Sequence, residues 1–497
     1  MNRQIGTLID RSGNITHVIV GDAKGIFIPG LENYPLGKKA LRGLRLIHTH
    51  MDEEALTQDD LTDLALLRLD ILVAIGVRNG LPGNVFAAYL MPGGTKPFEI
   101  LSAQNFHNFE LDFLPFIRSL EEEMERSRLF SPDDRRERAI LVSVSTMPKY
   151  EQEDSMEELK ELARSSDLLV LDAVIQRPKS INPRYMLGEG KIRELIINAL
   201  NKGATLLVFD QELNPSQVKA IGELTELKVI DRSQLILDIF ARRAQSRDGK
   251  VQVELAQLKY RLPRLTGKGT AMSRLMGGIG GRGPGEMKLE VDRRRVRDRI
   301  SLLEKELKSL REARKQRKHR RVAAGIPIVS IIGYTNAGKS TLLNSLTKSF
   351  VPVEDKLFAT LDTASRRLRF PRERDVIVTD TVGFIRDLPK DLMAAFRATL
   401  EELEDADVLL HLIDASNPRF EQHIESVENI LKELSLHEKP RLLVFNKTDR
   451  IDSEEAKNIA VRYNAVAVSA LDPSTFGPLL KAIEETVWME KMAELTR

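Results

Sequence analysis

Residues 333–340 of the chain read GYTNAGKS, a glycine-rich stretch that ends in lysine and serine. The apolar run 328–332 precedes it, and residues 341–346 follow with the apolar spacing of a helix. A strand, a glycine loop and a helix in this order give the motif G-x-x-x-x-G-K-[ST] its phosphate-binding context. Backbone N–H groups of such a loop surround phosphate oxygens, and the helix N-terminus adds the positive end of its dipole. The motifs further along the chain argue against the alternative, a chance glycine turn with a solvated lysine.

Five residues are expected to contact the phosphates and a metal ion. Lys339 should reach the β- and γ-phosphates, and the Ser340 hydroxyl should bind Mg²⁺. The next strand ends at Asp380, which is expected to hold Mg²⁺ through water, and the Gly383 N–H is expected to contact the γ-phosphate. Thr360 lies between these motifs and is the expected second Mg²⁺ hydroxyl. Catalysis would then be positioning and charge neutralisation by Lys339, Thr360 and Gly383, with in-line attack by water.

The base is predicted to be guanine. An apolar strand leads into Asn446, Lys447 and Asp449, and a carboxylate at this point accepts hydrogen bonds from guanine N1 and the 2-amino group, which adenine does not offer. Ser469 and Ala470 should supply the last base contact through the Ala470 N–H. The complete predicted GTP site is Gly333, Asn336, Ala337, Gly338, Lys339, Ser340, Thr341, Asp380, Gly383, Asn446, Lys447, Asp449, Ser469 and Ala470.

Two residues bear on the rate of hydrolysis. Phe384 follows Gly383, where Ras-type GTPases carry a glutamine that orients water. A phenyl ring cannot polarise water, so intrinsic hydrolysis should be slow unless a partner completes the site. Asn336 lies where potassium-dependent relatives of this class place a K⁺ ligand, although it could equally serve only to bond the loop.

Composition narrows the remaining possibilities. A chain of 497 residues favours about three domains. The absence of cysteine excludes disulfides, thiolate metal sites and cysteine nucleophiles, and suits a reducing cytosol. No apolar run of about 18 residues and no signal-peptide pattern is present, which predicts a cytoplasmic protein without stable membrane association. A monomer is expected.

We expect an α/β multidomain protein with four segments. Residues 1–137 form a mixed α/β extension that ends in a polar stretch, and residues 138–232 form a small α/β subdomain in which strands alternate with helices. Residues 233–325 form a long antiparallel helical hairpin with a glycine-rich tip loop. Residues 326–497 form the P-loop G domain, a mostly parallel sheet with helices on both faces, and end in a short helical tail.

The hairpin suggests a nucleic-acid partner. Its tip, residues 274–286, contains too many glycines for regular structure, and a loop that becomes ordered against a partner suits that composition. The following long helix carries a basic run over 311–321, in which Glu312 is the lone acidic residue, and this run suits an RNA backbone better than the alternative of a solvated charged face. The expected RNA contacts are Gly277, Gly278, Gly280, Arg282, Arg314, Lys315, Arg317 and Lys318.

A second motif lies in the N-terminal extension. His48 and His50 would point to the same side of a strand, and Asp60 on the next helix could complete a zinc site. The pattern resembles HxH…SxxD of JAB/MPN-type metalloproteins, but its spacing is one residue short, Thr57 replaces serine, and the proline and upstream glutamate are missing. A structural histidine pair is the alternative, and these differences favour a JAB/MPN-like fold without the metal.

Several stretches resemble the HflX family of ribosome-associated GTPases. They are residues 229–232, 235–240, 253–258, 277–286, 333–340 and 380–389. The resemblance covers about residues 138–471 and implies GTP/GDP and Mg²⁺ as ligands. It also implies binding to the large ribosomal subunit and its RNA, splitting of stalled or idle ribosomes, and a tip loop that reaches toward the peptidyl transferase centre.

The resemblance also implies ATP binding and RNA unwinding in the α/β subdomain, for which residues 188–191 (GEGK), at a helix start, are a candidate. Residues 1–137 resemble the extension of long family members, and the C-terminal domain of some members is expected to be absent. Thr363 and Ala364 replace the usual Pro-Thr, which strengthens the assignment of Thr360. The alternatives are a GTP-sensing RNA-binding or anti-association regulator without splitting activity, and an ATP-dependent RNA-remodelling enzyme.

Overall fold

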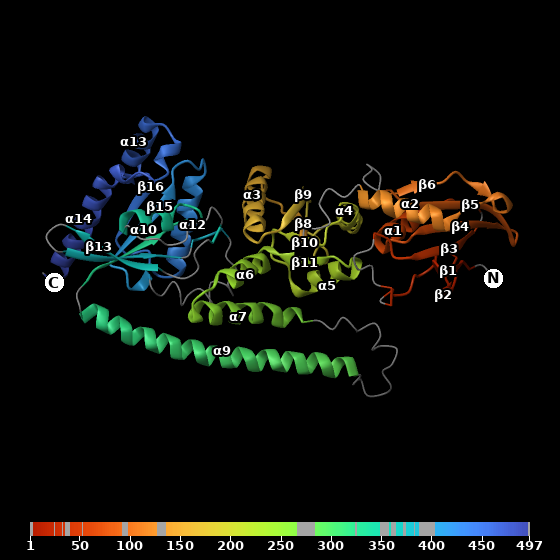
Figure 1. Ribbon diagram of the computed structural model, residues 1–497, viewed down its shortest axis with the longest axis horizontal. Helices are drawn as coiled ribbons and strands as arrows, with labels where there is room; N and C mark the ends of the chain where they lie inside the picture. The colour runs from red at the N-terminus through yellow and green to blue at the C-terminus, as the bar shows by residue number, and fades with distance from the viewer. Residues whose placement is uncertain are drawn as a thin grey trace. The chain divides into compact units, whose positions relative to one another are not determined.

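The computed structural model (Figure 1) describes residues 3–23, 25–31, 33–34, 40–51, 53–91, 98–126, 136–265, 284–323, 326–347, 357–358, 364–370, 374–381, 383–386 and 403–495. The chain divides into two compact units. The first is formed by Met1–Met156 with Leu168–Ile230, and the second by Glu157–Asp167 with Asp231–Arg497. Among the described residues, no helix is both long and apolar enough to cross a membrane.

The first unit begins with a seven-stranded sheet of order β2-β1-β3-β4-β5-β6, in which β7 also pairs with β5. Its strands are β1 (Ile5–Asp10), β2 (Ile15–Val20), β3 (Leu44–Met51), β4 (Ile71–Arg78), β5 (Leu81–Leu90), β6 (Phe98–Ile100) and β7 (Gln104–Asn105). β3 and β4 are parallel because α1 (Gln58–Leu67) connects them, whereas the other neighbours are antiparallel. Helices α1 and α2 (Phe113–Arg126) contribute Leu64 and Ile117 to one core with Leu46 of β3.

The period-2 pattern of β3 is regular: its residues alternate between buried and half-buried from Leu44 to Met51. His48 and His50 therefore share the buried face with Leu44 and Leu46. A capping box between Thr57 and Asp60 begins α1 directly after this strand. Histidines and carboxylate thus lie on adjacent elements.

A second sheet in this unit has the order β11-β10-β8-β9. It consists of β8 (Arg138–Val144), β9 (Leu169–Gln176), β10 (Leu206–Phe209) and β11 (Lys228–Asp231), with the helices α3 (Lys149–Ser165), α4 (Glu189–Asn201) and α5 (Pro215–Leu224) between them. β8 is parallel to both neighbours, as the alternation of strands and helices predicts. Ile192 and Ile196 of α4 and Ile221 of α5 pack into its core.

In the second unit, α6 (Arg232–Arg243) and α7 (Arg247–Arg261) precede α9 (Pro284–Ala323), a helix of 40 residues. α7 and α9 lie side by side (Figure 1) and bury Val251 and Leu255 against Leu303 and Leu307. Two ion pairs, Arg247–Glu306 and Glu254–Arg299, join the helices. The later residue of α7 pairs with the earlier residue of α9, so the two helices are antiparallel. The predicted tip glycines 277, 278 and 280 and Arg282 lie outside the described residues.

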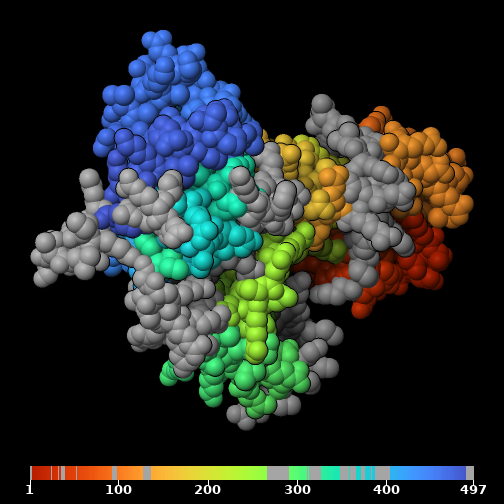
Figure 2. Space-filling model, turned by 60° about the vertical axis from the view of Figure 1, so that its left-hand side comes forward, coloured from red at the N-terminus to blue at the C-terminus, as the bar shows by residue number. Residues whose placement is uncertain are grey.

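The C-terminal sheet has the order β13-β14-β12-β15-β16-β17, and only β13 and β14 are antiparallel. The strands are β12 (Ile328–Ile332), β13 (Ala364–Phe370), β14 (Arg374–Asp380), β15 (Val408–Asp414), β16 (Arg441–Asn446) and β17 (Val466–Ala467). Its helices are α10 (Lys339–Thr347), α12 (Phe420–Glu433), α13 (Ser453–Arg462) and α14 (Phe476–Leu495). The C-terminal residues, blue in Figure 2, form one continuous lobe.

Helices cover both faces of this sheet, as predicted. Leu412 of β15 belongs to a core with Leu342 of α10 and Leu479 of α14. Its neighbour Ile413 points to the other face, into a core that includes Ile424 of α12. The alternation along β15 therefore supplies two separate hydrophobic cores.

Glu158 of α3 bonds two other segments of the second unit. One carboxylate oxygen accepts a hydrogen bond from the Arg232 guanidinium at the start of α6, and the other accepts from the Tyr334 hydroxyl in the loop after β12. The Tyr334 oxygen accepts in turn from the Arg386 N–H (2.9 Å), and the Tyr334 ring stacks on His423 with a centroid distance of 3.8 Å. Burial and the charge of Glu158 raise the pKa of Tyr334 well above its ordinary value, so the hydroxyl keeps its proton.

A second contact joins the same helices to the short described segment after α10. Leu357 N–H donates to the Ser165 hydroxyl at the end of α3 (2.9 Å). Phe358 packs edge-on against Phe240 of α6, with ring centroids 4.6 Å apart. α3 and α6 thus contact both the glycine loop itself and the segment that follows α10.

Replacing Tyr334 with phenylalanine should lower the free energy of unfolding of the second unit by about 1–3 kcal/mol. The reason is that the Glu158 carboxylate and the Arg386 N–H each lose their hydrogen bond to the Tyr334 hydroxyl. Trp488, the only tryptophan in the sequence, packs against Phe370 and reports urea unfolding of this unit by fluorescence. Tyr463→Phe is the matched control in the same unit, since its hydroxyl bonds Glu421 at the surface and the change should be within about 0.5 kcal/mol. Equal midpoints for the two variants would contradict the role of Tyr334.

Candidate nucleotide-binding site

The loop between β12 and α10 has a backbone that requires glycine at two positions. Gly333 has a φ of 147°, and a Cβ there would lie 2.2 Å from the carbonyl oxygen of Leu412 on β15. Gly338 has a φ of 91°, and its Cβ would lie 2.3 Å from the side-chain nitrogen of Asn446. Any larger residue would displace the loop from the neighbouring strands.

Lys339 is buried at the first turn of α10 and bends back over its own loop. Its ammonium group donates to the carbonyl oxygens of Gly333 (3.1 Å) and Tyr334 (2.8 Å). Burial lowers the pKa of Lys339 to about 8, although the carboxylate of Asp380 opposes this shift. A Cβ on Gly383 would lie 2.9 Å from the Lys339 nitrogen, so these two predicted site residues are adjacent.

Ser340 and Asp380 form the oxygen-rich part of the site. The Ser340 hydroxyl donates to a carboxylate oxygen of Asp380 at 2.6 Å, and both residues are buried at the ends of α10 and β14. A hydroxyl and a carboxylate are ligand types that suit Mg²⁺, which prefers oxygen ligands. Thr360, the other predicted Mg²⁺ ligand, lies outside the described residues.

The segment after β14 is bonded to the glycine loop. Thr335 N–H donates to the Phe384 carbonyl (2.7 Å), and Phe384 N–H donates to the Gly333 carbonyl (3.1 Å). The Phe384 side chain is only 2% exposed, so its ring packs in the interior. The Thr335 hydroxyl is also buried and has no hydrogen-bond partner among the described residues.

The opposite end of the site is assembled by one amide side chain. Asn446 donates to the Ala337 carbonyl (2.7 Å) and accepts from the Ala470 N–H (2.8 Å). Ser469 donates to a carboxylate oxygen of Asp449 at 2.6 Å and so orients it. The Ala470 N–H, predicted to contact the base, is thus already bonded to Asn446, and a base oxygen would have to share or displace this bond.

Lys447 and Tyr334 have partners that sequence reasoning missed. Lys447 has a left-handed φ of 62° and forms an ion pair with Asp414 at 2.7 Å. Asp414 ends the apolar strand β15, and this position at a parallel strand's carboxyl end could have signalled its role. Nothing in the sequence distinguishes Tyr334 from other residues at the variable positions of the loop.

The remaining predicted residues are distributed as follows. Thr341 lies in the first turn of α10, and Asn336 has a left-handed φ of 61° in the loop. Arg314, Lys315, Arg317 and Lys318 lie on α9, but their side chains lie outside the described part. At the weaker candidate site, Lys191 pairs with Glu194 of its own helix (2.8 Å), and a Cβ on Gly188 or Gly190 would meet no atom within 4 Å.

Comparison with known proteins finds similarity to GTP-binding proteins. Three family models match successive parts of the chain: "GTP-binding GTPase N-terminal" over residues 153–241, "GTP-binding GTPase Middle Region" over 243–321 and "50S ribosome-binding GTPase" over 328–447. A crystal structure of a GTP-binding protein from the archaeon Sulfolobus solfataricus in complex with GDP is 26% identical, with a TM-score of 0.38, and the match covers 71% of this chain and 99% of that one.

Two curated relatives match over most of their lengths. GTPase HflX of Caldanaerobacter subterraneus subsp. tengcongensis is 48% identical over 355 residues, which cover 71% of this chain and 82% of the relative. GTPase HflX of Escherichia coli is 42% identical over 364 residues, which cover 72% and 84%. The chain therefore belongs to the HflX family of GTPases.

Proposed function

We propose that this GTPase binds the large ribosomal subunit and dissociates stalled or idle ribosomes in the cytoplasm. The observation that carries the proposal is the match of residues 328–447 to the 50S ribosome-binding GTPase model, on a chain whose nucleotide-site motifs converge at one edge of the sheet. The hairpin α7–α9 supports it, because its basic end and glycine-rich tip suit RNA.

In this proposal the triphosphate lies along the glycine loop. Loop N–H groups and the helix N-terminus of α10 hold its oxygens, and Lys339 exchanges two carbonyl partners for phosphate oxygens. The buried Thr335 hydroxyl supports this placement, since a donor in such a position gains a partner when phosphate binds. Ser340, Asp380 and Thr360 would hold Mg²⁺, which neutralises charge on the β- and γ-oxygens.

Guanine would lie between the loops that follow β16 and β17. Asp449 accepts from the base N1 and 2-amino groups, while Ser469 holds its carboxylate in place. Asn446 joins the loop after β16 to the glycine loop and to the loop after β17 by its two hydrogen bonds. Lys447, fixed by Asp414, packs its stem over the base.

Hydrolysis requires a water in line with the γ-phosphate, and the interior position of Phe384 leaves that residue unable to orient one. We therefore expect slow intrinsic turnover that the ribosome accelerates. Asn336 would bind K⁺ near the developing charge. The RNA contacts in this proposal are the tip residues Gly277, Gly278, Gly280 and Arg282 and the α9 residues Arg314, Lys315, Arg317 and Lys318.

The buried Phe384 also favours a second candidate function, a GTP-sensing regulator that binds the subunit and prevents association without splitting ribosomes. Hydrolysis would then only reset binding. Sedimentation of intact ribosomes with the protein and a non-hydrolysable GTP analogue separates the two functions. Splitting yields free subunits from intact ribosomes, whereas the regulator blocks only re-association.

Lys339→Ala should lower GTP hydrolysis in the presence of large subunits by about 100-fold or more, because the charge opposite the phosphates is lost. The measurement is phosphate release with and without subunits. Lys191→Ala, on α4, is the control and should behave as wild type. If large subunits do not stimulate hydrolysis by the wild type, the ribosomal proposal is wrong, whereas the assignment of the nucleotide site still stands.

Asp449→Asn should weaken GDP binding by about 10- to 100-fold, since hydrogen bonds to a charged group contribute about 1.5–3 kcal/mol. The asparagine side chain offers an N–H group that matches the 2-carbonyl of xanthine, so xanthosine diphosphate should gain affinity. Titration with fluorescent analogues of both nucleotides measures the two affinities. Loss of GDP binding without a gain for xanthosine diphosphate would indicate damage to the loop instead of changed base recognition.

GDP binding should take up about half a proton at pH 8, because the free Lys339 has a pKa of about 8 and bound phosphate raises it. Affinity is then fully present below pH 8 and falls as the pH rises above it. Calorimetric titration in two buffers with different ionisation heats measures the number of protons taken up for each GDP bound. Equal binding heats in both buffers would show that Lys339 does not change its protonation.

A further inference from the structure

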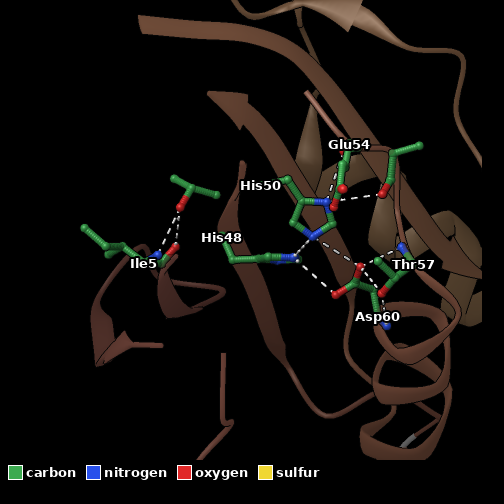
Figure 3. Close-up of polar contacts among 8 residues, drawn as sticks. Ile5, His48, His50, Glu54, Thr57 and Asp60 are labelled. Carbon is green, nitrogen blue, oxygen red and sulfur yellow. Dashed lines mark hydrogen bonds and ion pairs between the residues drawn. The ribbon is translucent and has the colours of Figure 1, made fainter. Parts of the chain in front are cut away.

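Three ligand-type side chains converge in the N-terminal sheet, outside the nucleotide site (Figure 3). The Nε2 atoms of His48 and His50 lie 2.8 Å apart, and each lies 3.3 Å from a different carboxylate oxygen of Asp60. His48 and His50 project from the buried face of β3, and Asp60 comes from the first turn of α1. The ligand atoms of all three residues lie within 4.8 Å of one another.

The hydrogen bonds of His50 fix which ring nitrogen is available. Its Nδ1 faces two carbonyl oxygens, Glu54 at 3.0 Å and Ala55 at 3.2 Å, so this nitrogen carries the proton. When the ring is neutral, the lone pair of Nε2 points toward His48 and Asp60. A backbone carbonyl on the far nitrogen is the usual support of a metal-binding histidine.

Asp60 is held in place independently of the histidines. One carboxylate oxygen accepts from both the N–H and the hydroxyl of Thr57, each at 2.7 Å, while the Thr57 hydroxyl accepts from the Asp60 N–H at 3.2 Å. This capping box begins α1 and fixes the carboxylate at the same time. The histidine strand is equally constrained, because β3 is paired on both edges by β1 and β4.

Burial makes the cluster a defined site in which Asp60 is the most exposed member. The side chains of His48 and His50 are 0% and 3% exposed, whereas that of Asp60 is 16% exposed. Two imidazoles and one carboxylate match the ligands of zinc sites with three protein ligands and a fourth open position. Calcium and magnesium prefer sites built from oxygen alone, so a transition metal suits this set better.

We propose that His48, His50 and Asp60 bind a zinc-like divalent transition-metal ion with a solvent-accessible fourth position. Zinc–nitrogen bonds of about 2.0–2.1 Å at a tetrahedral angle need the two Nε2 atoms about 3.3 Å apart, so the rings separate by roughly half an ångström on binding. Each ring nitrogen lies 3.3 Å from a different carboxylate oxygen, so the carboxylate also turns slightly on binding to bring one oxygen close to both nitrogens. The site is independent of the GTPase activity, which belongs to the second unit.

The test uses the untagged full-length chain, stripped with a chelator, exposed to Zn²⁺ and passed through a desalting column. We expect one zinc per chain by elemental analysis, and the Co²⁺-loaded protein should show the intense visible absorption of a four-coordinate site. His50→Ala and Asp60→Asn should each lose the bound metal and this absorption. Unchanged far-ultraviolet circular dichroism verifies that the variants fold, and unchanged GTP hydrolysis verifies that the second unit is unaffected.

Two matched controls sharpen the test. His107→Ala removes an exposed histidine of the same unit and should keep the metal. Thr57→Ala removes the cap but no ligand, so it should retain zinc with a loss in affinity of about tenfold, the effect of removing a supporting hydrogen bond. If wild type binds no more zinc than Asp60→Asn, the proposal is wrong and the cluster is a hydrogen-bonded histidine–aspartate network.

Discussion

The nucleotide end of the molecule depends on the side-chain amide of Asn446. Its nitrogen bonds the carbonyl of Ala337 in the glycine loop and its oxygen bonds the N–H of Ala470 after β17. Three loops that meet at the carboxyl edge of the sheet are thereby tied by one buried residue. The close approach of Gly338 to the same amide shows how tightly this junction is packed.

A comparable junction forms where α3 and α6 meet the glycine loop. Glu158 bonds Tyr334 and Arg232 at the same time, and the Tyr334 oxygen also accepts from the Arg386 N–H. The loop that would hold phosphate is therefore bonded to α3, a helix far from it in sequence, and through Glu158 to α6. A buried polar network of this kind favours one arrangement of its members.

Much of the architecture could be predicted because its signals are local. The glycine loop between a strand and a helix and the alternation of strands and helices each depend on neighbouring residues. Tyr334 and Glu158 could not be paired, since nothing in either segment indicates a partner so distant in sequence. The bond between Ala470 and Asn446 was missed for the same reason, because both were assigned from motifs without considering how they contact each other.

The histidine motif shows the opposite limit of sequence reasoning. Its imperfect spacing favoured a fold without metal, yet helix α1 brings Asp60 to both histidines, because the capping box turns its carboxylate toward β3. Spacing along the chain is a poor measure of convergence when a turn of unknown shape intervenes. Tertiary structure, which no pattern of three residues encodes, decides whether ligands meet.

The alternation of β3 has a consequence for how this cluster would persist through evolution. His48 and His50 share their face with Leu44 and Leu46, which fill the core beneath the sheet. A slip of the strand by one residue would expose all four side chains together, so selection for the core also preserves the inward histidine pair. Related proteins would lose the cluster only by substitutions at His48, His50 or Asp60. The residues at these three positions therefore show which relatives retain it.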